Sequence, residues 1–121
     1  MPAPSPEPAR FLPLSEPVFQ ILLALAEAEL HGYAIIQAIQ EQSRGEVVLT
    51  ASTLYSALRR LLADGLIEER PARSPGDDPR RRYYRLAKLG FQVARLEAER
   101  IERAARLARS RRILPPQSRR R

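Results

Sequence analysis

Short hydroxyl side chains and arginines gather between residues 52 and 60, and they are the groups in this sequence best suited to contact a ligand. If the stretch is helical, a rotation of about 100° per residue places one set of these side chains on a single face. That face holds Ser52, Ser56, Arg59, Arg60 and Ala63, flanked by Thr53 and Tyr55. Hydroxyl and guanidinium groups can approach base edges and phosphate oxygens closely, and no bulky apolar residue blocks the face. The pattern predicts contact with a nucleic acid.

A second arginine cluster follows in the sequence and comprises Arg73, Arg80, Arg81 and Arg82. Guanidinium groups are planar donors whose geometry suits phosphate oxygens. Taken singly, each arginine of either cluster could equally belong to a solvated charged surface and pair with a nearby acid. The acids within reach in sequence are Asp64, Glu68, Asp77 and Asp78. Taken jointly, the two clusters favour DNA as the ligand.

The residues needed for catalysis are scarce. His31 is the only histidine, and the chain has no cysteine. No carboxylate pair or glycine-rich phosphate loop stands at a spacing that catalysis requires. His31 precedes Gly32 at an expected helix start, where we expect it to cap or pack rather than to bind a metal. We therefore predict no enzymatic activity, no metal and no cofactor.

The net charge of +7 is unevenly distributed along the chain. Residues 1–50 hold two arginines against six acids, whereas residues 51–90 hold nine bases against five acids. Residues 109–121 contain six arginines and no acid. An anionic polymer would therefore approach the second half of the chain. A basic surface that only keeps the protein soluble is the alternative reading of the charge taken alone.

The length of 121 residues fits one domain. No apolar run approaches the ~20 residues that cross a bilayer, and the proline-rich start lacks the apolar stretch of a signal peptide. The lack of cysteine agrees with a reducing compartment. We expect a cytoplasmic protein without a membrane partner. Prolines at positions 2, 4, 6, 8 and 13 predict that residues 1–13 form an extended, disordered arm.

Apolar periodicity and capping residues predict four helices and one hairpin. The first helix follows Ser15 and ends near Ala28, and the second carries Ile35, Ile36 and Ile39 before a stop at residues 43–45. Residues 47–49 remain open between a brief strand and a packed loop. A third helix follows Thr50 and ends at Gly65. Strands at 67–70 and 81–86 flank a loop at 71–79, and a last helix spans 87–112.

This order of elements predicts a mainly α fold with a small β-hairpin, namely a winged helix-turn-helix followed by a dimerisation helix. In such a fold the third helix enters the major groove and the hairpin, or wing, lies along the adjacent backbone. The winged helix-turn-helix would span residues 14–86, the last helix 87–112, and a disordered basic tail 113–121.

The last helix carries apolar residues on two faces. One set repeats with alternating spacings of three and four residues, as in a coiled-coil seam, and consists of Phe91, Ala94, Ala98, Ile101, Ala105 and Ala108. The other set is Leu89, Val93, Leu96, Ala104 and Leu107. One face could cover the domain and the other meet a second copy, so we expect a homodimer. A helix that packs only on its own domain is the alternative.

The sequence from about Leu14 to Gly90 resembles the PadR-type transcriptional regulators. The matching motifs are HGY at 31–33, STLYSALRRLLADGLIE at 52–68 and RRRYYRLAKLG at 80–90. The resemblance implies a recognition helix opened by Thr53, Leu54 and Tyr55, with Tyr55 touching the phosphate backbone and the wing arginines contacting flanking DNA. A half-buried packing role is the alternative for Tyr55. The single C-terminal helix resembles the short subfamily, and Ala87 replaces the threonine that usually caps that helix.

The resemblance therefore predicts a sequence-specific repressor that binds an inverted-repeat operator in double-stranded DNA as a homodimer. Any small-molecule effector stays unidentified by the sequence. One alternative is a basic protein that coats DNA or RNA without sequence preference. Another is an interaction module whose winged fold binds a protein. Membrane-surface binding by the last helix is disfavoured because alanines stand where large apolar residues would be needed.

Overall fold

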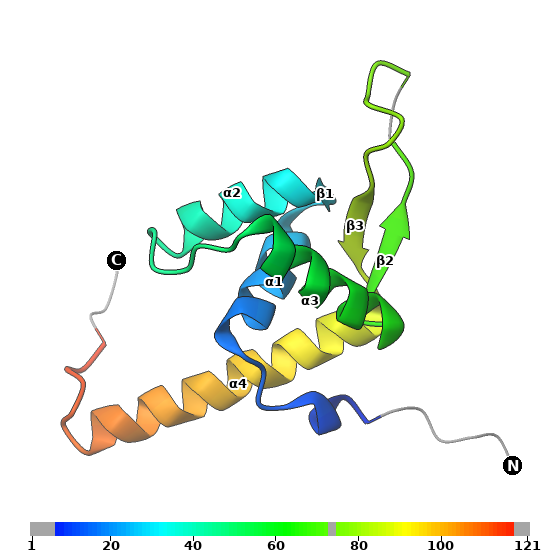
Figure 1. Ribbon diagram of the computed structural model, residues 1–121. Coiled ribbons are helices and arrows are strands. Elements are labelled where there is room, and N and C mark those ends of the chain that lie inside the picture. The colour runs from blue at the N-terminus through cyan, green and yellow to red at the C-terminus, as the bar shows by residue number, and fades with distance from the viewer. Residues whose placement is uncertain (1–6, 73–74, 118–121) are drawn as a thin grey trace, which may run out of the picture.

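The computed structural model describes residues 7–72 and 75–117. Figure 1 shows a group of short helices packed together, a long C-terminal helix crossing beneath them, and a wing that projects from one side. The helices are η1 (Pro8–Phe11, a 3₁₀ turn), α1 (Glu16–Glu27), α2 (Gly32–Gln42), α3 (Ala51–Ala63) and α4 (Lys88–Ser110). The strands are β1 (Leu30–His31), β2 (Ile67–Arg70) and β3 (Tyr83–Leu86). The predicted fold class is confirmed.

Side chains at the predicted positions cap the first three α-helices. Ser15 accepts a hydrogen bond from the Val18 amide at the start of α1. Thr50 accepts one from the Thr53 amide at the start of α3, over 3.1 Å. At α4 the N-cap residue is Ala87, which makes no side-chain hydrogen bond. The starts of α1 and α3 are thus held by a side chain, and that of α4 is not.

Three helices end in a left-handed residue that turns the chain away from the helix axis. Gly65 (φ +77°) serves this role after α3, as predicted from the sequence. After α2 the left-handed residue is Arg44 (φ 55°), and Gly45 (φ 80°) follows it. After α4 it is Arg112 (φ 62°). In all three cases the amide of the next residue bonds back to a carbonyl in the last helical turn.

The sheet is antiparallel and has three strands in the order β1-β3-β2. The predicted hairpin is present, with Glu69 opposite Tyr84, but β3 begins at Tyr83 and not at residue 81. Strand β1, which lies where we expected only a break, pairs Leu30 with Tyr84. Residues 47–49 form no strand and are a packed loop in which Val47 and Leu49 are buried.

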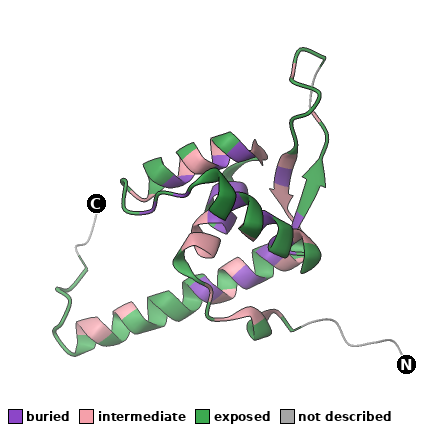
Figure 2. Cartoon of the chain, in the orientation of Figure 1, coloured by how far each residue is buried: buried purple, intermediate pink, exposed green. Residues whose placement is uncertain are grey.

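The hydrophobic core lies between α1, α2, α3, the sheet and the first half of α4. Its fully buried large side chains are Ile21, Leu22, Ile35, Ile39, Leu54, Leu58, Leu66 and Val93. Figure 2 shows the buried positions concentrated where these elements meet. Each helix of the core therefore exposes its opposite face, and α3 exposes the face that carries hydroxyls and arginines.

The predicted extended arm is wrong for residues 8–11, which form η1 and pack against α4. Phe11 and Leu12 lie partly buried against the core, so folding begins before Leu14. The Leu14 amide donates a hydrogen bond to Glu97 Oε1 over 3.3 Å. Apolar burial and this bond offset the entropy lost when the segment is ordered. Residues 1–6 lie outside the described part of the chain.

Helix α4 ends at Ser110, two residues before its predicted end. Its buried residues, Gly90, Val93 and Glu97, all lie in its first half. The second half extends beyond the other helices (Figure 1). Among the described residues, no helix is long and apolar enough to span a bilayer.

Candidate nucleic-acid interface

Helix α3 presents the predicted polar face to solvent. Leu54, Leu58 and Leu61 anchor the helix in the core, and Ser52, Ser56, Arg59 and Arg60 on the other side are exposed. Within the described part of the chain, neither Arg59 nor Arg60 forms an ion pair. Two guanidinium groups on the helix are therefore available to a ligand.

The Thr53 hydroxyl is already engaged in the structure. Thr50 donates to it over 3.0 Å while also accepting from the Thr53 amide. Thr53 therefore belongs to the cap of α3 as well as to its exposed side. Its hydroxyl keeps its own hydrogen for donation to a base or a phosphate.

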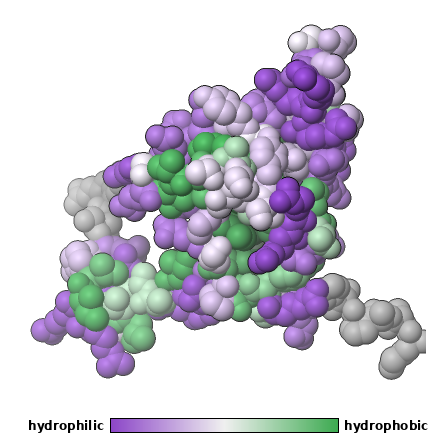
Figure 3. All heavy atoms as spheres, viewed as in Figure 1, coloured by the Kyte–Doolittle hydropathy of each residue, from purple (hydrophilic) through white to green (hydrophobic). Residues whose placement is uncertain are grey.

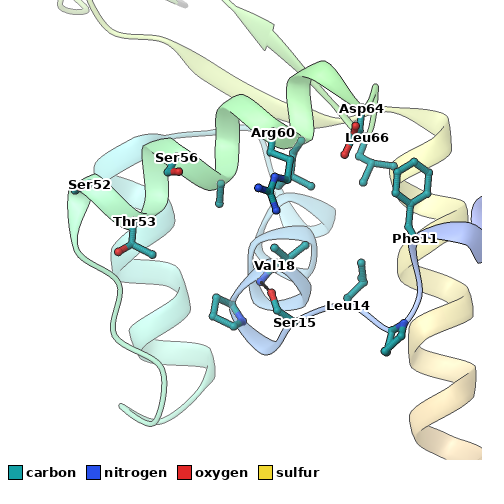
Figure 4. Close-up of a pocket in the computed structure, with 14 residues that line it drawn as sticks. Phe11, Leu14, Ser15, Val18, Ser52, Thr53, Ser56, Arg60, Asp64 and Leu66 are labelled. Carbon is teal, nitrogen blue, oxygen red and sulfur yellow. Dashed lines mark hydrogen bonds between the residues drawn. The ribbon is translucent and has the colours of Figure 1, made fainter.

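A groove of about 650 Å³ separates one edge of α3 from the N-terminal segment and α1. Phe11, Leu14 and Val18 form its apolar wall, and Thr53, Ser56, Arg60 and Asp64 lie along its α3 edge. Figure 4 shows Arg60 extending from α3 toward α1 across this groove. Thr53 and Arg60 thus flank the exposed face on the side of the groove.

Tyr55 lies on the opposite edge of α3, next to the wing. Its side chain packs over Gly32, where an added Cβ would collide with the Tyr55 hydroxyl. Tyr55 remains 43% exposed. It lines a cleft of about 220 Å³ together with His31, Gly32, Tyr33, Arg80, Arg81, Arg82 and Tyr84. The half-buried packing expected as one alternative is therefore present, and contact of Tyr55 with a phosphate stays a prediction.

The wing arginines are paired with carboxylates. Arg80 contacts Asp78 at 3.4 Å, Arg81 contacts Asp77 at 3.1 Å, and Arg82 contacts Glu69 at 3.6 Å. Arg85 contacts Glu68 at 2.7 Å. Pairing with Asp77 and Asp78 was the alternative interpretation of this cluster, and it describes the protein without DNA. Arg73 lies outside the described residues. Figure 3 shows hydrophilic residues covering the wing.

His31 caps α2, as its position predicted. Its Nδ1 accepts a hydrogen bond from the Ala34 amide over 3.2 Å. Its ring meets the edge of Tyr83 on β3, with ring centres 5.5 Å apart. Burial lowers the pKa of His31, and the charge of Arg81 lowers it further, while Asp77 acts in the opposite direction. The histidine therefore joins α2 to the wing in its neutral form.

A family comparison agrees with this arrangement. The model of the transcriptional regulator PadR-like family matches residues 21–96, from the middle of α1 into the first half of α4. The chain belongs to the PadR-like family. Membership confirms the expectation of a DNA-binding transcriptional regulator rather than an enzyme. No curated protein matches the sequence closely enough to count as a relative.

Solved structures of other regulators share the fold. A transcriptional regulator from Clostridium thermocellum is 27% identical, with a TM-score of 0.64 over 77% of this chain and 86% of that one. PcaV from Streptomyces coelicolor, solved with its natural ligand, is 28% identical, with a TM-score of 0.62 over 77% of this chain and 59% of PcaV. PadR from Bacillus subtilis, solved with operator DNA, is 25% identical, with a TM-score of 0.59 over 67% of this chain and 46% of PadR.

The PadR-like motifs of the sequence meet at the root of the wing. The HGY motif supplies His31, which caps α2, and Gly32, against which the Tyr55 side chain packs closely. The recognition-helix motif supplies Tyr55 over that glycine, and the returning strand supplies Tyr83 against His31. Three motifs that are distant in sequence therefore fix the position of the wing relative to α3.

Sequence reasoning missed Glu97, the one charged residue among the described residues that is buried. Its carboxylate accepts two hydrogen bonds from Arg100, at 2.7 and 3.1 Å, and one from the Leu14 amide. The bonds from Arg100 lower the pKa of Glu97, although burial acts in the opposite direction. Its spacing of four residues from Val93 places it on the domain face of α4, which is the signal that could have revealed it.

Proposed function

We propose that this protein is a repressor that binds a specific DNA sequence as a homodimer. The observation that carries the proposal is the exposed face of α3, where Arg59 and Arg60 lack ion-pair partners in the described part of the chain and stand among short hydroxyls. A helix that reads the major groove needs such a face, because only side chains that are not already paired within the protein can bond to base edges. The operator complex of Bacillus subtilis PadR supports the same role for this fold.

The residues divide into two roles. Ser52, Thr53, Ser56 and Arg59 would read base edges from α3, with Arg60 beside them on the groove side. Arg80, Arg81 and Arg82 would hold the backbone from the wing, and Tyr55 would donate to a phosphate at the cleft that it shares with them. Base contacts give specificity and phosphate contacts give position. The same division would extend to Arg73, whose placement is not described.

A second copy would place a second α3 on the same side of the DNA. Dimers of this class read two half-sites about 34 Å apart, which is one turn of the double helix. The operator should therefore be an inverted repeat of that period. The alternating 3,4 spacing on α4 and its uncovered second half support dimerisation through Phe91, Ala94, Ala98, Ile101, Ala105 and Ala108. PcaV was solved with its natural ligand, and a small-molecule effector of this protein would act on the proposed dimer.

Selection of bound DNA from a random pool tests the proposal. We expect enrichment of one inverted repeat, bound about 10³-fold or more tightly than scrambled DNA at physiological salt. If the affinity is equal for all DNA sequences, and if rising salt concentration lowers it equally for all of them, the protein coats DNA without sequence preference. Capture of a protein partner after nuclease digestion, with no enriched DNA, would indicate an interaction module.

A further inference from the structure

The groove of about 650 Å³ beside α3 has an apolar wall although it lies at the surface. Phe11, Leu14 and Val18 are only partly buried, so their side chains remain open to the groove. Leu61 and Leu66, which belong to the core, also line it. Figure 3 shows hydrophobic residues on the side of α3 that faces α1 and α4. An apolar hollow of this volume falls within the range of small-molecule sites, which is about 300–1,000 Å³.

Two charged residues of α3, Arg60 and Asp64, line the same groove. They are four residues apart, a spacing that allows an ion pair on a helix. Neither of them belongs to an ion pair among the described residues. Figure 4 shows Arg60 directed across the groove toward α1, and Asp64 beside Leu66. An unpaired guanidinium therefore lies over an apolar wall, where a ligand that joins a carboxylate to an apolar body would satisfy both.

The wall suits an alkyl chain better than a flat ring. Among the described residues, Phe11 is the only aromatic one that lines the groove. The Arg10 guanidinium already lies over the Phe11 ring, 4.8 Å from its centre. One face of the ring is thus covered, and no second aromatic side chain of the described residues lines the groove to stack a flat ligand. The other apolar lining residues are aliphatic, and such side chains bury an alkyl chain without requiring a stacked geometry.

We propose that the groove binds an alkyl carboxylate of medium length, with its carboxylate paired to Arg60 and its chain packed against Leu14 and Phe11. The Ser15 hydroxyl also lines the groove. Because this hydroxyl accepts a hydrogen bond from a backbone amide, it keeps its own hydrogen for donation to the same carboxylate. Figure 4 shows Ser15 on the side of the groove that Arg60 faces.

The ligand and DNA would compete for Arg60. This step rests on the proposed function, in which α3 enters the major groove with Arg60 beside the reading residues. A carboxylate on Arg60 removes the positive charge that a phosphate would meet, and the bound molecule stands next to Thr53 and Ser56. The alkyl carboxylate and the operator should therefore weaken each other's binding by the same factor. The ligand then acts as an inducer that releases the DNA.

Calorimetric titration of the full chain with straight-chain carboxylates from hexanoate to decanoate tests the site. Each added methylene should tighten binding roughly two- to fourfold, since it buries more apolar surface. Decanol lacks the charge, naphthoate replaces the chain by a flat ring, and both should bind at least about tenfold more weakly than decanoate. Equal binding of decanol would overturn the pairing with Arg60. Tighter binding of naphthoate would overturn the alkyl chain as the ligand.

Substitutions on α3 locate the site. Arg60→Gln should weaken decanoate binding about ten- to a hundredfold, because it removes a charged hydrogen-bond donor. Asp64→Asn should strengthen binding, because it removes a like charge from the groove. The matched control Arg59→Gln changes an exposed neighbour that does not line the groove, and it should bind decanoate as the wild type does. Equal losses for Arg60→Gln and Arg59→Gln would overturn the site.

Operator binding separates this inference from the proposed function. Saturating decanoate should weaken binding of the selected operator at least about tenfold. The variant Ala57→Leu, which fills the groove from α3, should bind the operator equally with and without decanoate. Full operator affinity in the presence of bound decanoate would overturn the competition. A chain that binds an operator but no carboxylate would overturn the ligand site and leave the proposed function standing. A chain that binds decanoate but no DNA would overturn the proposed function and the competition with it.

Discussion

At the residue scale, the proposed DNA contacts would require each described wing arginine to exchange a carboxylate for a phosphate. Arg82 is half exposed, as is its partner Glu69, and the two are 3.6 Å apart. Exposed pairs of this kind contribute about 0–1 kcal/mol. The exchange would therefore cost little free energy, and the carboxylates would weaken binding mainly by repelling the phosphates.

Replacing Glu69 with Gln should strengthen binding to every DNA sequence, because it removes a negative charge from the wing and leaves Arg82 unpaired. The logarithm of the affinity should also depend more steeply on salt concentration. An unpaired Arg82 would neutralise a phosphate more fully and would therefore displace more of the counterions bound to the DNA. Fluorescence anisotropy titrations at several salt concentrations measure both quantities. Glu46→Gln is the control for net charge, because Glu46 is exposed and forms no ion pair with any described residue. Unchanged binding by Glu69→Gln would place the wing away from DNA.

His31 predicts a dependence of stability on pH. Its pKa is lowered in the folded protein, so the folded state binds fewer protons than the unfolded state as pH falls below the ordinary value of about 6.5. Stability present above that pH should therefore be lost as pH decreases toward the lowered pKa, because a protonated Nδ1 cannot accept from Ala34. His31→Asn should cap α2 without titrating. Urea midpoints between pH 7.5 and 5.5 that fall equally in both proteins would contradict this role.

At the scale of elements, the N-terminal segment and α4 are joined through Glu97. Glu97→Ala would leave the Leu14 amide without its partner and Arg100 without its carboxylate. We expect a loss of roughly 1–3 kcal/mol in the free energy of unfolding. Hydrogen exchange should also accelerate at the Leu14 amide. Glu99→Ala, an exposed change on the same helix, should have little effect on either quantity. A protected Leu14 amide in Glu97→Ala would show that apolar contacts alone hold the segment.

The elements that were predictable carry their signals locally. Helix starts are marked by the capping residues Ser15 and Thr50, and the end of α3 is marked by Gly65. The 3.6-residue period assigns Leu54, Leu58 and Leu61 to the core. The two missed elements depend on distant partners. A strand of two residues such as β1 shows no alternation, and it exists because β3 pairs with it. The 3₁₀ turn η1 is ordered by α4, whose contacting residues follow it by some eighty positions.

The same distinction applies to the site. The exposed face of α3 followed from spacing alone, because a helix rotates by a fixed angle per residue. The ion pairs of Arg80, Arg81 and Arg82 could not be assigned individually, since loop conformation selects the partner of each. The packing of Tyr55 over Gly32 joins α3 to α2 and was equally inaccessible to spacing arguments.

At the scale of the whole molecule, assembly should depend on the seam of α4. Ile101→Asp puts a charge where the proposed partner packs, and we expect this variant to sediment as a monomer at micromolar concentrations at which the wild type is a dimer. Arg103→Asp introduces the same side chain on the opposite side of the helix and should remain dimeric. Ile101 is 44% exposed in the single chain, so its replacement should leave the fold intact. A dimeric Ile101→Asp would show that α4 does not form the interface through this face.

The most direct test of the central claim compares Arg59→Ala with Arg82→Ala on the selected operator and on scrambled DNA, across several salt concentrations. Arg59→Ala should cost roughly 1–3 kcal/mol on the operator and relax selectivity at one base pair, as expected for the loss of a bidentate base contact. Arg82→Ala should weaken binding to all sequences alike and flatten the salt dependence by about one unit. A uniform loss for Arg59→Ala with a selective loss for Arg82→Ala would reverse the two roles. If neither variant changes binding, α3 and the wing do not form the DNA-binding surface.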